Sequence, residues 1–111
     1  MSRLSYAASG SIRLMTPPMI RLARSDDLSE LLSLYRQLNP DDPVLDVEAA
    51  GPVWSELLAS DFTVVYVAEL AGRLVSSCTL AIVPNLSRGA RAYGAIENVV
   101  TDAGHRRRGL A

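Results

Sequence analysis

The chain of 111 residues is long enough for one domain with one hydrophobic core. Its 49% hydrophobic and 21% charged residues are usual for a soluble globular protein, and a net charge of −1 argues against a nucleic-acid or anionic-lipid partner. No apolar run approaches the ~20 residues that span a bilayer, and Cys78 has no second cysteine to pair with. We therefore expect a cytoplasmic protein without a membrane partner and with Cys78 as a buried thiol.

The first third of the chain predicts a leader, a strand and a helix. Residues 1–18 lack sustained periodicity and end in two prolines, as expected of a disordered leader. Residues 19–23 alternate apolar and polar side chains, which is typical of a short strand. Ser25 is the predicted N-cap of a helix whose leucines follow at helical spacing, and Asn39-Pro40 ends that helix.

A second helix follows an acidic turn. Asp46 can cap it, and the helix should run to about Ser60. Gly51-Pro52 interrupts the pattern, so we expect the regular part to begin near Pro52. Trp54 lies on the apolar face and is interpreted as a core residue, with a place beside an acceptor pocket as the alternative.

The middle of the chain predicts a sheet. Residues 62–69 and 73–83 are rich in β-branched and aromatic side chains and flank an Ala71-Gly72 turn, which predicts an antiparallel hairpin. Apolar residues on both faces of these strands indicate a sheet covered on both sides. A loop at 84–91 leads to another strand at 92–101. The fold class is therefore α+β, layered, with two N-terminal helices and the order β-α-α-β-β-β.

The last fifteen residues, ENVVTDAGHRRRGLA, hold the chemistry-bearing motif. Backbone N–H groups at a turn that enters a helix bind pyrophosphate, a glycine allows close approach, and guanidinium groups add two-donor contacts. A solvated basic turn is the alternative interpretation. A nucleic-acid patch is also conceivable, but three arginines without interleaved aromatic residues are a poor footprint. The G-x-x-x-x-G-K-[ST] pattern of nucleotide-triphosphate loops is absent.

This stretch resembles the acetyl-CoA-binding motif of the GNAT superfamily of N-acetyltransferases. That motif is a strand followed by Q/R-x-x-G-x-G/A, which Arg106, Gly109 and Ala111 match. The element order also resembles the family's, so residues 19–111 are identified as the N-terminal part of a GNAT domain with a mixed, mostly antiparallel sheet and without the C-terminal half of the fold. The resemblance implies acetyl-CoA as cosubstrate and no metal. The cofactor-binding residues it implies are Val99, Val100, Thr101, Arg106, Arg107, Arg108, Gly109, Leu110 and Ala111.

The resemblance also assigns roles along the strand. Its backbone would pair with the pantetheine arm of CoA, the amide of Val99 would donate to an oxyanion, and His105 would belong to the pyrophosphate turn. Glu97 is the catalytic candidate, because an amine must lose a proton before it attacks a thioester. The alternative is that Glu97 only orders the strand or binds substrate. Asn98 stands where some sugar-phosphate acetyltransferases of the family have an aspartate, so that acid pair is not reproduced.

The implied function is transfer of acetyl from acetyl-CoA to a primary amine of a small molecule or a protein N-terminus. The acceptor is not readable from the sequence. An acidic loop, containing Asp41, Asp42 and Asp46, would attract a cationic amine or would simply be solvated. The alternative function is a truncated, non-catalytic domain that self-associates, for example as a homodimer, or binds a partner through an uncovered sheet face.

Overall fold

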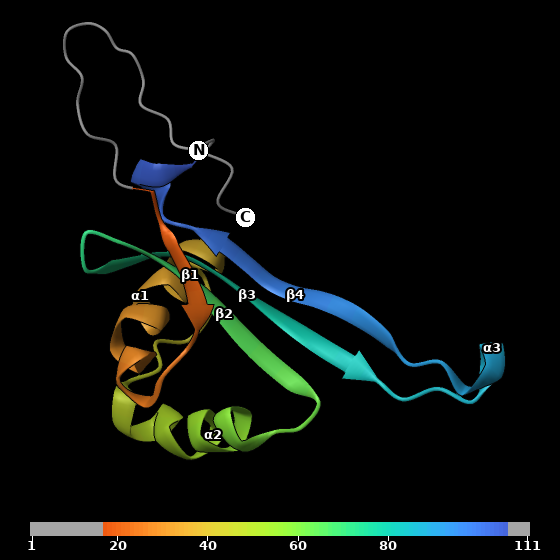
Figure 1. Cartoon of the computed structure of the whole chain (residues 1–111). Helices are drawn as coiled ribbons and strands as arrows, with labels where there is room; N and C mark the ends of the chain where they lie inside the picture. The colour runs from red at the N-terminus through yellow and green to blue at the C-terminus, as the bar shows by residue number, and fades with distance from the viewer. Residues whose placement is uncertain (1–16, 107–111) are drawn as a thin grey trace, which may run out of the picture.

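The computed structural model describes residues 17–106 and shows one sheet with two helices on one of its faces (Figure 1). All neighbouring strands are antiparallel, in the order β1-β2-β3-β4. The strands are β1 (Met19–Leu22), β2 (Thr63–Leu70), β3 (Arg73–Val83) and β4 (Tyr93–Thr101). The helices and short turns are η1 (Ser25–Asp27), α1 (Leu28–Leu38), α2 (Val47–Ala59), α3 (Ser87–Ala90) and η2 (Ala103–His105). The predicted α+β class and element order are confirmed, whereas most of the predicted leader lies outside the described residues.

The two hairpins of the sheet differ in length and in their turns. β2 and β3 are joined at Ala71 and Gly72, whose φ angles of +53° and +79° suit the twist of a tight hairpin. This confirms the predicted turn. The hairpin of β3 and β4 projects beyond the helices and ends in α3 (Figure 1). Arg88 and Gly89 have positive φ angles there, so α3 is a left-handed turn rather than a regular helix.

The core lies between the sheet and the two helices. α1 packs on β3 and β4, and α2 packs on β2. The buried cluster consists of Leu28, Leu31, Leu34, Ala50, Trp54, Val65, Val67, Leu74 and Val100. The Trp54 indole N–H donates to the carbonyl oxygen of Ser25 at 3.2 Å, which satisfies its one donor inside this cluster. The interpretation of Trp54 as a core residue is confirmed.

The opposite face of the sheet carries exposed apolar side chains. Ile20 and Leu22 pair with Ala68 and Tyr66, so these four residues share that face. Ile20 is 60% exposed and Leu22 is 56% exposed. Within residues 17–106 the sheet is therefore not covered on both sides as predicted. Cys78 pairs with Tyr66 on this face and is only partly buried, so its predicted burial is wrong.

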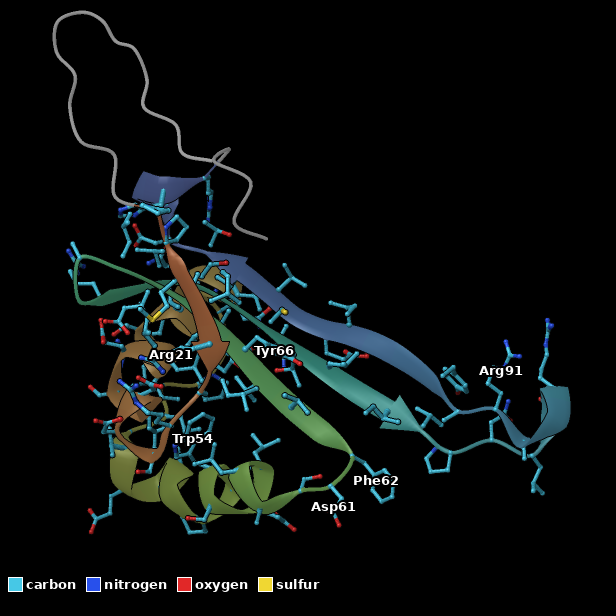
Figure 2. All side chains as sticks on the ribbon, viewed as in Figure 1. Arg21, Trp54, Asp61, Phe62, Tyr66 and Arg91 are labelled. Atoms are coloured by element: carbon cyan, nitrogen blue, oxygen red, sulfur yellow. The ribbon has the colours of Figure 1, made fainter. Side chains whose placement is uncertain are left out.

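The residue that directly precedes α1 is Asp27 rather than Ser25. The Arg24 N–H donates to the Asp27 carboxylate at 2.7 Å, and η1 precedes the helix. Asp27 also accepts hydrogen bonds of 2.8 and 3.0 Å from Arg21, whose Nε donates to Glu69 at 2.9 Å. Figure 2 shows Arg21 in this position beside α1. The predicted Ser25 cap is therefore wrong, because Ser25 lies inside η1 and the residue before α1 is Asp27, whose carboxylate accepts from the Arg24 N–H rather than from an N–H of α1.

α2 begins earlier than the Gly51-Pro52 pair predicts. The Asp46 carboxylate accepts from the N–H of Ala49 at 2.8 Å, so the predicted cap is confirmed. The helix then runs continuously from Val47, with Pro52 inside it. A cap that satisfies the first turn allows the helix to tolerate the single hydrogen bond that proline removes.

Among the described helices, none combines the length and the apolar character needed to cross a membrane.

Candidate active site

β4 carries a bulge at the centre of the candidate site. β3 pairs Ser77 with Val100 and Thr79 with Glu97, so two β4 residues lie opposite Cys78 alone. One of them is Asn98, whose φ of +50° lies in the left-handed region that asparagine adopts more readily than most residues. A bulge interrupts the ladder and redirects the side chains around it. β4 is also an edge of the described sheet, so its outer backbone groups face no strand there.

The three strand residues predicted to contact the cofactor differ in their surroundings. Val99 is 40% exposed, whereas the Val100 side chain belongs to the core. The Val100 carbonyl accepts from the Ser76 hydroxyl at 2.9 Å, and the Thr101 carbonyl accepts from Arg106 Nε at 3.0 Å. Val99 is therefore the most accessible of the three, and the predicted contacts of all three with pantetheine stay predictions.

The turn after β4 is held by Asp102. Its Oδ2 accepts from the Gly104 N–H at 3.1 Å and lies 2.8 Å from His105 Nδ1. Its Oδ1 accepts from the side-chain amide of Gln37 at 2.9 Å, and the Gln37 carbonyl accepts from the Ala103 N–H at 2.8 Å. Hydrogen bonds from Gln37 and His105 lower the pKa of Asp102 to about 2. The two hydrogen bonds of Gln37 tie the turn to the C-terminal end of α1.

A cavity of about 240 Å³ lies between the end of α1, the loop after it and β4. Its lining consists of Leu32, Tyr35, Arg36, Asn39, Asp42, Pro43, Leu45 and Asn98. A guanidinium, a carboxylate and two amides beside apolar walls are suited to a small polar ligand. Of the three acidic-loop residues, only Asp42 lines the cavity, while Asp46 caps α2.

Glu97 lies next to the cavity along the chain but is not part of its lining. It is exposed and pairs with Thr79, whose side chain is buried. Trp54 also lies outside the lining, so the structure does not bring it to this pocket. The role of Glu97 as a base stays a prediction. The remaining predicted cofactor residues lie outside the described part of the chain: Arg107, Arg108, Gly109, Leu110 and Ala111.

Two residues of this region were not found as site residues by sequence reasoning. In the sequence Asn98 stands out only as a departure from the acid pair of some family members, although asparagine inside a β-branched strand is a weak signal for a left-handed bulge. Gln37 gives no local signal, because its partners are 65 and 66 residues away in sequence. Within residues 17–106, no group of three or more His, Cys, Asp and Glu side chains is arranged to hold a metal ion.

The family model described as "Acetyltransferase (GNAT) family" matches residues 28–111. The chain belongs to the GNAT family of acetyltransferases. It is 37% identical over 91 residues to the "Glucosamine 6-phosphate N-acetyltransferase" of Trypanosoma brucei brucei, a match that covers 82% of this chain and 62% of the relative. GNAT acetyltransferases use acetyl-CoA as cosubstrate.

Solved structures give the same family. The structure named "Putative acetyltransferase from Agrobacterium tumefaciens str. C58" is 47% identical, with a TM-score of 0.80, and the match covers 83% of this chain and 64% of that one. Glucosamine-6-phosphate N-acetyltransferase from Arabidopsis thaliana is 25% identical, with a TM-score of 0.74 over 86% of this chain and 67% of that one. The chain thus spans 62% and 64% of the length of the Trypanosoma and Agrobacterium proteins.

Proposed function

We propose that this GNAT chain takes part in transfer of an acetyl group from acetyl-CoA to a primary amine. The observation that carries the proposal is the β4 bulge at Asn98 and Val99. It lies between the cavity, which Asn98 lines, and the Asp102 turn that leads into the arginine motif. An amine in the cavity and a thioester along the edge of β4 would therefore meet at the bulge.

The residues at the bulge fit the chemistry of acyl transfer. The bound acetyl-CoA supplies a thioester. The Glu97 carboxylate accepts a proton from the ammonium of the acceptor, directly or through water, which frees the lone pair for attack on the carbonyl carbon. The N–H of Val99 donates to the carbonyl oxygen as it gains negative charge. The C–N bond then forms, the C–S bond breaks, and the departing thiolate takes up the second proton that the nitrogen loses as it becomes an amide.

The acceptor we favour is an amino sugar that carries a phosphate. The lining of the cavity includes Arg36, whose guanidinium suits an anionic group, and Asp42, whose carboxylate suits an ammonium. The Trypanosoma relative, at 37% identity, is named for glucosamine 6-phosphate. A panel of glucosamine 6-phosphate, glucosamine and a peptide N-terminus tests this choice. The highest kcat/KM is expected for the phosphorylated sugar, and equal values for glucosamine would contradict a role for the phosphate.

Glu97→Gln tests the proposed base. The amide has nearly the same shape but cannot accept the proton, so turnover is expected to fall by about 100-fold or more. The dissociation constant for acetyl-CoA should stay the same, because Glu97 is assigned no contact with CoA. The matched control is Glu56→Gln on the exposed side of α2, which should leave turnover unchanged. A wild-type rate for Glu97→Gln at neutral pH would remove Glu97 as the base.

The exposed sheet face favours a second candidate, a domain that self-associates without catalysis. Ile20, Leu22 and Tyr66 expose apolar surface on the face that carries no described helix. Size-exclusion chromatography combined with an acetyl-CoA titration separates the two candidates. Acetyl-CoA binding with acetyl transfer supports the enzyme. Self-association without affinity for acetyl-CoA supports the second candidate and contradicts the first.

A further inference from the structure

Gln37 is the one described side chain of α1 that is hydrogen-bonded to the turn after β4. Its amide N–H donates to Asp102 Oδ1 at 2.9 Å, while its carbonyl accepts from the Ala103 N–H at 2.8 Å. The planar side-chain amide of Gln37 therefore uses both its donor and its acceptor, on the adjacent residues Asp102 and Ala103. Such a pair of bonds fixes the orientation of the turn as well as its distance from the helix.

The turn is closed from its other side as well. The N–H of Asp102 donates to the Val75 carbonyl at 2.8 Å, and the N–H of His105 donates to the Asp102 carbonyl at 2.8 Å. Arg106, where the R-x-x-G-x-A motif starts, donates from Nε to the Thr101 carbonyl at 3.0 Å. The direction in which the chain leaves β4 therefore depends on this small network, of which Gln37 is the member supplied by a helix.

The same end of α1 also lines the cavity. Tyr35, Arg36 and Asn39 contribute to the cavity wall, and Gln37 lies between them in sequence. Gln37 and Ala103 are both exposed, so their hydrogen bond adds little to the packing of the core. An exposed polar contact between the cavity wall and the turn after β4 is better suited to holding the position of the turn than to stabilising the fold.

We propose that Gln37 is a positioning residue that holds the Asp102–His105 turn for acetyl-CoA and links that turn, through α1, to the acceptor cavity. The inference rests on the proposed function, because it takes the motif after the turn as the acetyl-CoA site. Loss of both hydrogen bonds removes the tie between the turn and α1, so that acetyl-CoA must supply this part of the turn's order on binding. Linkage requires that a change in acetyl-CoA affinity caused by a bound acceptor is matched by an equal change in acceptor affinity.

Gln37→Ala in the full chain is the first test. We expect acetyl-CoA to bind about tenfold more weakly by calorimetry, in line with the loss of two exposed hydrogen bonds. The KM for acetyl-CoA should rise by a similar factor, with kcat within about twofold of the wild type. The amides of Ala103 and Gly104 should exchange hydrogen faster, while the melting temperature changes little. Ser33→Ala, at another exposed position of α1, is the matched control and should change none of these values.

An exchange of donor and acceptor tests the contact itself. Gln37→Glu sets a carboxylate against Asp102 and should weaken acetyl-CoA binding more than Gln37→Ala does. Adding Asp102→Asn restores a donor at that point, because the new amide N–H faces the new carboxylate. Its carbonyl oxygen can still accept from Gly104 and His105, and the carboxylate at position 37 can still accept from Ala103. The double variant should recover to within about threefold of the wild-type affinity.

The outcomes separate this inference from the proposed function. If the wild-type chain binds acetyl-CoA and the Gln37→Ala variant binds it with the same dissociation constant, this inference alone is contradicted. A double variant that binds no better than Gln37→Glu contradicts it too, because the pair would then not interact. A wild-type chain without affinity for acetyl-CoA contradicts both proposals.

Discussion

A buried ionic network holds the start of α1, and a more exposed hydrogen-bond network holds its end. At its start, Arg21 joins Asp27 and Glu69, and the Asp27 side chain is only 6% exposed. At its end, Gln37 joins the turn at Asp102, whose side chain is 27% exposed. The first network connects β1, η1 and β2 inside the fold. The second connects the helix to the candidate active site at the rim.

The difference in burial determines what each network contributes. A charge that loses its partner inside a protein is left without compensation, so breaking a buried pair strongly lowers stability. Water replaces the lost partner of an exposed hydrogen bond at much smaller cost. One helix therefore separates the two tasks: its start holds the fold together, and its end orients the site. Substitutions at the two ends should differ in what they impair.

The largest expected effect is that of Asp27→Asn on stability. The amide cannot neutralise Arg21, whose side chain is only 14% exposed, and Glu69 alone remains as its anion. We expect the free energy of unfolding to fall by about 3 kcal/mol in urea titrations. Asp26→Asn is the control, because Asp26 is 80% exposed and lies 3.7 Å from Arg24. That variant should stay within about 0.5 kcal/mol of the wild type. Equal losses for both variants would show that burial of the network is not what matters.

A smaller effect is expected at the bulge, where Asn98→Val and Asn98→Gly should diverge. Valine at a φ of +50° is strained by about 1–2 kcal/mol, whereas glycine adopts this conformation freely. Asn98→Val should therefore lose stability and activity together. Asn98→Gly should keep its stability and raise only the KM for the amine, because the cavity loses the Asn98 amide. If both variants unfold at the same urea concentration, the left-handed bulge is not a constraint on the fold.

Local signals explain what the sequence could predict. The bounds of β3, the turn at Ala71 and Gly72, and the end of α1 at Leu38 all agree with prediction, because β-branched runs, turn residues and proline act over a few neighbours. The family itself was predictable from a short, dense motif, as the match over residues 28–111 confirms.

Features that depend on distant partners were not predictable in this way. Ser25 is the predicted cap, yet it lies inside η1, and the carboxylate of Asp27, the residue before α1, is bonded to Arg21 and to the Arg24 N–H. The link from Gln37 to Asp102 joins residues 65 positions apart, and no short pattern encodes it. The predicted burial of Cys78 is wrong because apolar residues on both faces of a strand do not by themselves supply cover for both faces, and the described residues cover only one.

The smallest expected effect distinguishes the two aspartates by their titration. Both pKa values are lowered, that of Asp27 chiefly by Arg21 and that of Asp102, to about 2, chiefly by Gln37 and then His105. A lowered carboxyl pKa contributes stability that is complete above the usual value of 3.8 and is lost for Asp102 as the pH falls through about 2. Carboxyl-carbon NMR titration of Gln37→Ala should move the Asp102 midpoint upward toward 3.8 and leave Asp27 unchanged.

The direction of that shift follows from the charge state that Gln37 stabilises. Its N–H donates to the ionised carboxylate, so removing the donor favours the protonated form and raises the pKa. The contribution to global stability is small because Asp102 is partly exposed and solvent takes over the lost contact. An unchanged Asp102 midpoint in Gln37→Ala would mean that His105 and Gly104 hold the carboxylate without the helix. Only the hydrogen bond from the Ala103 N–H to Gln37 would then join the turn to α1, and the end of the helix would be tied to the site more weakly than its start is tied to the fold.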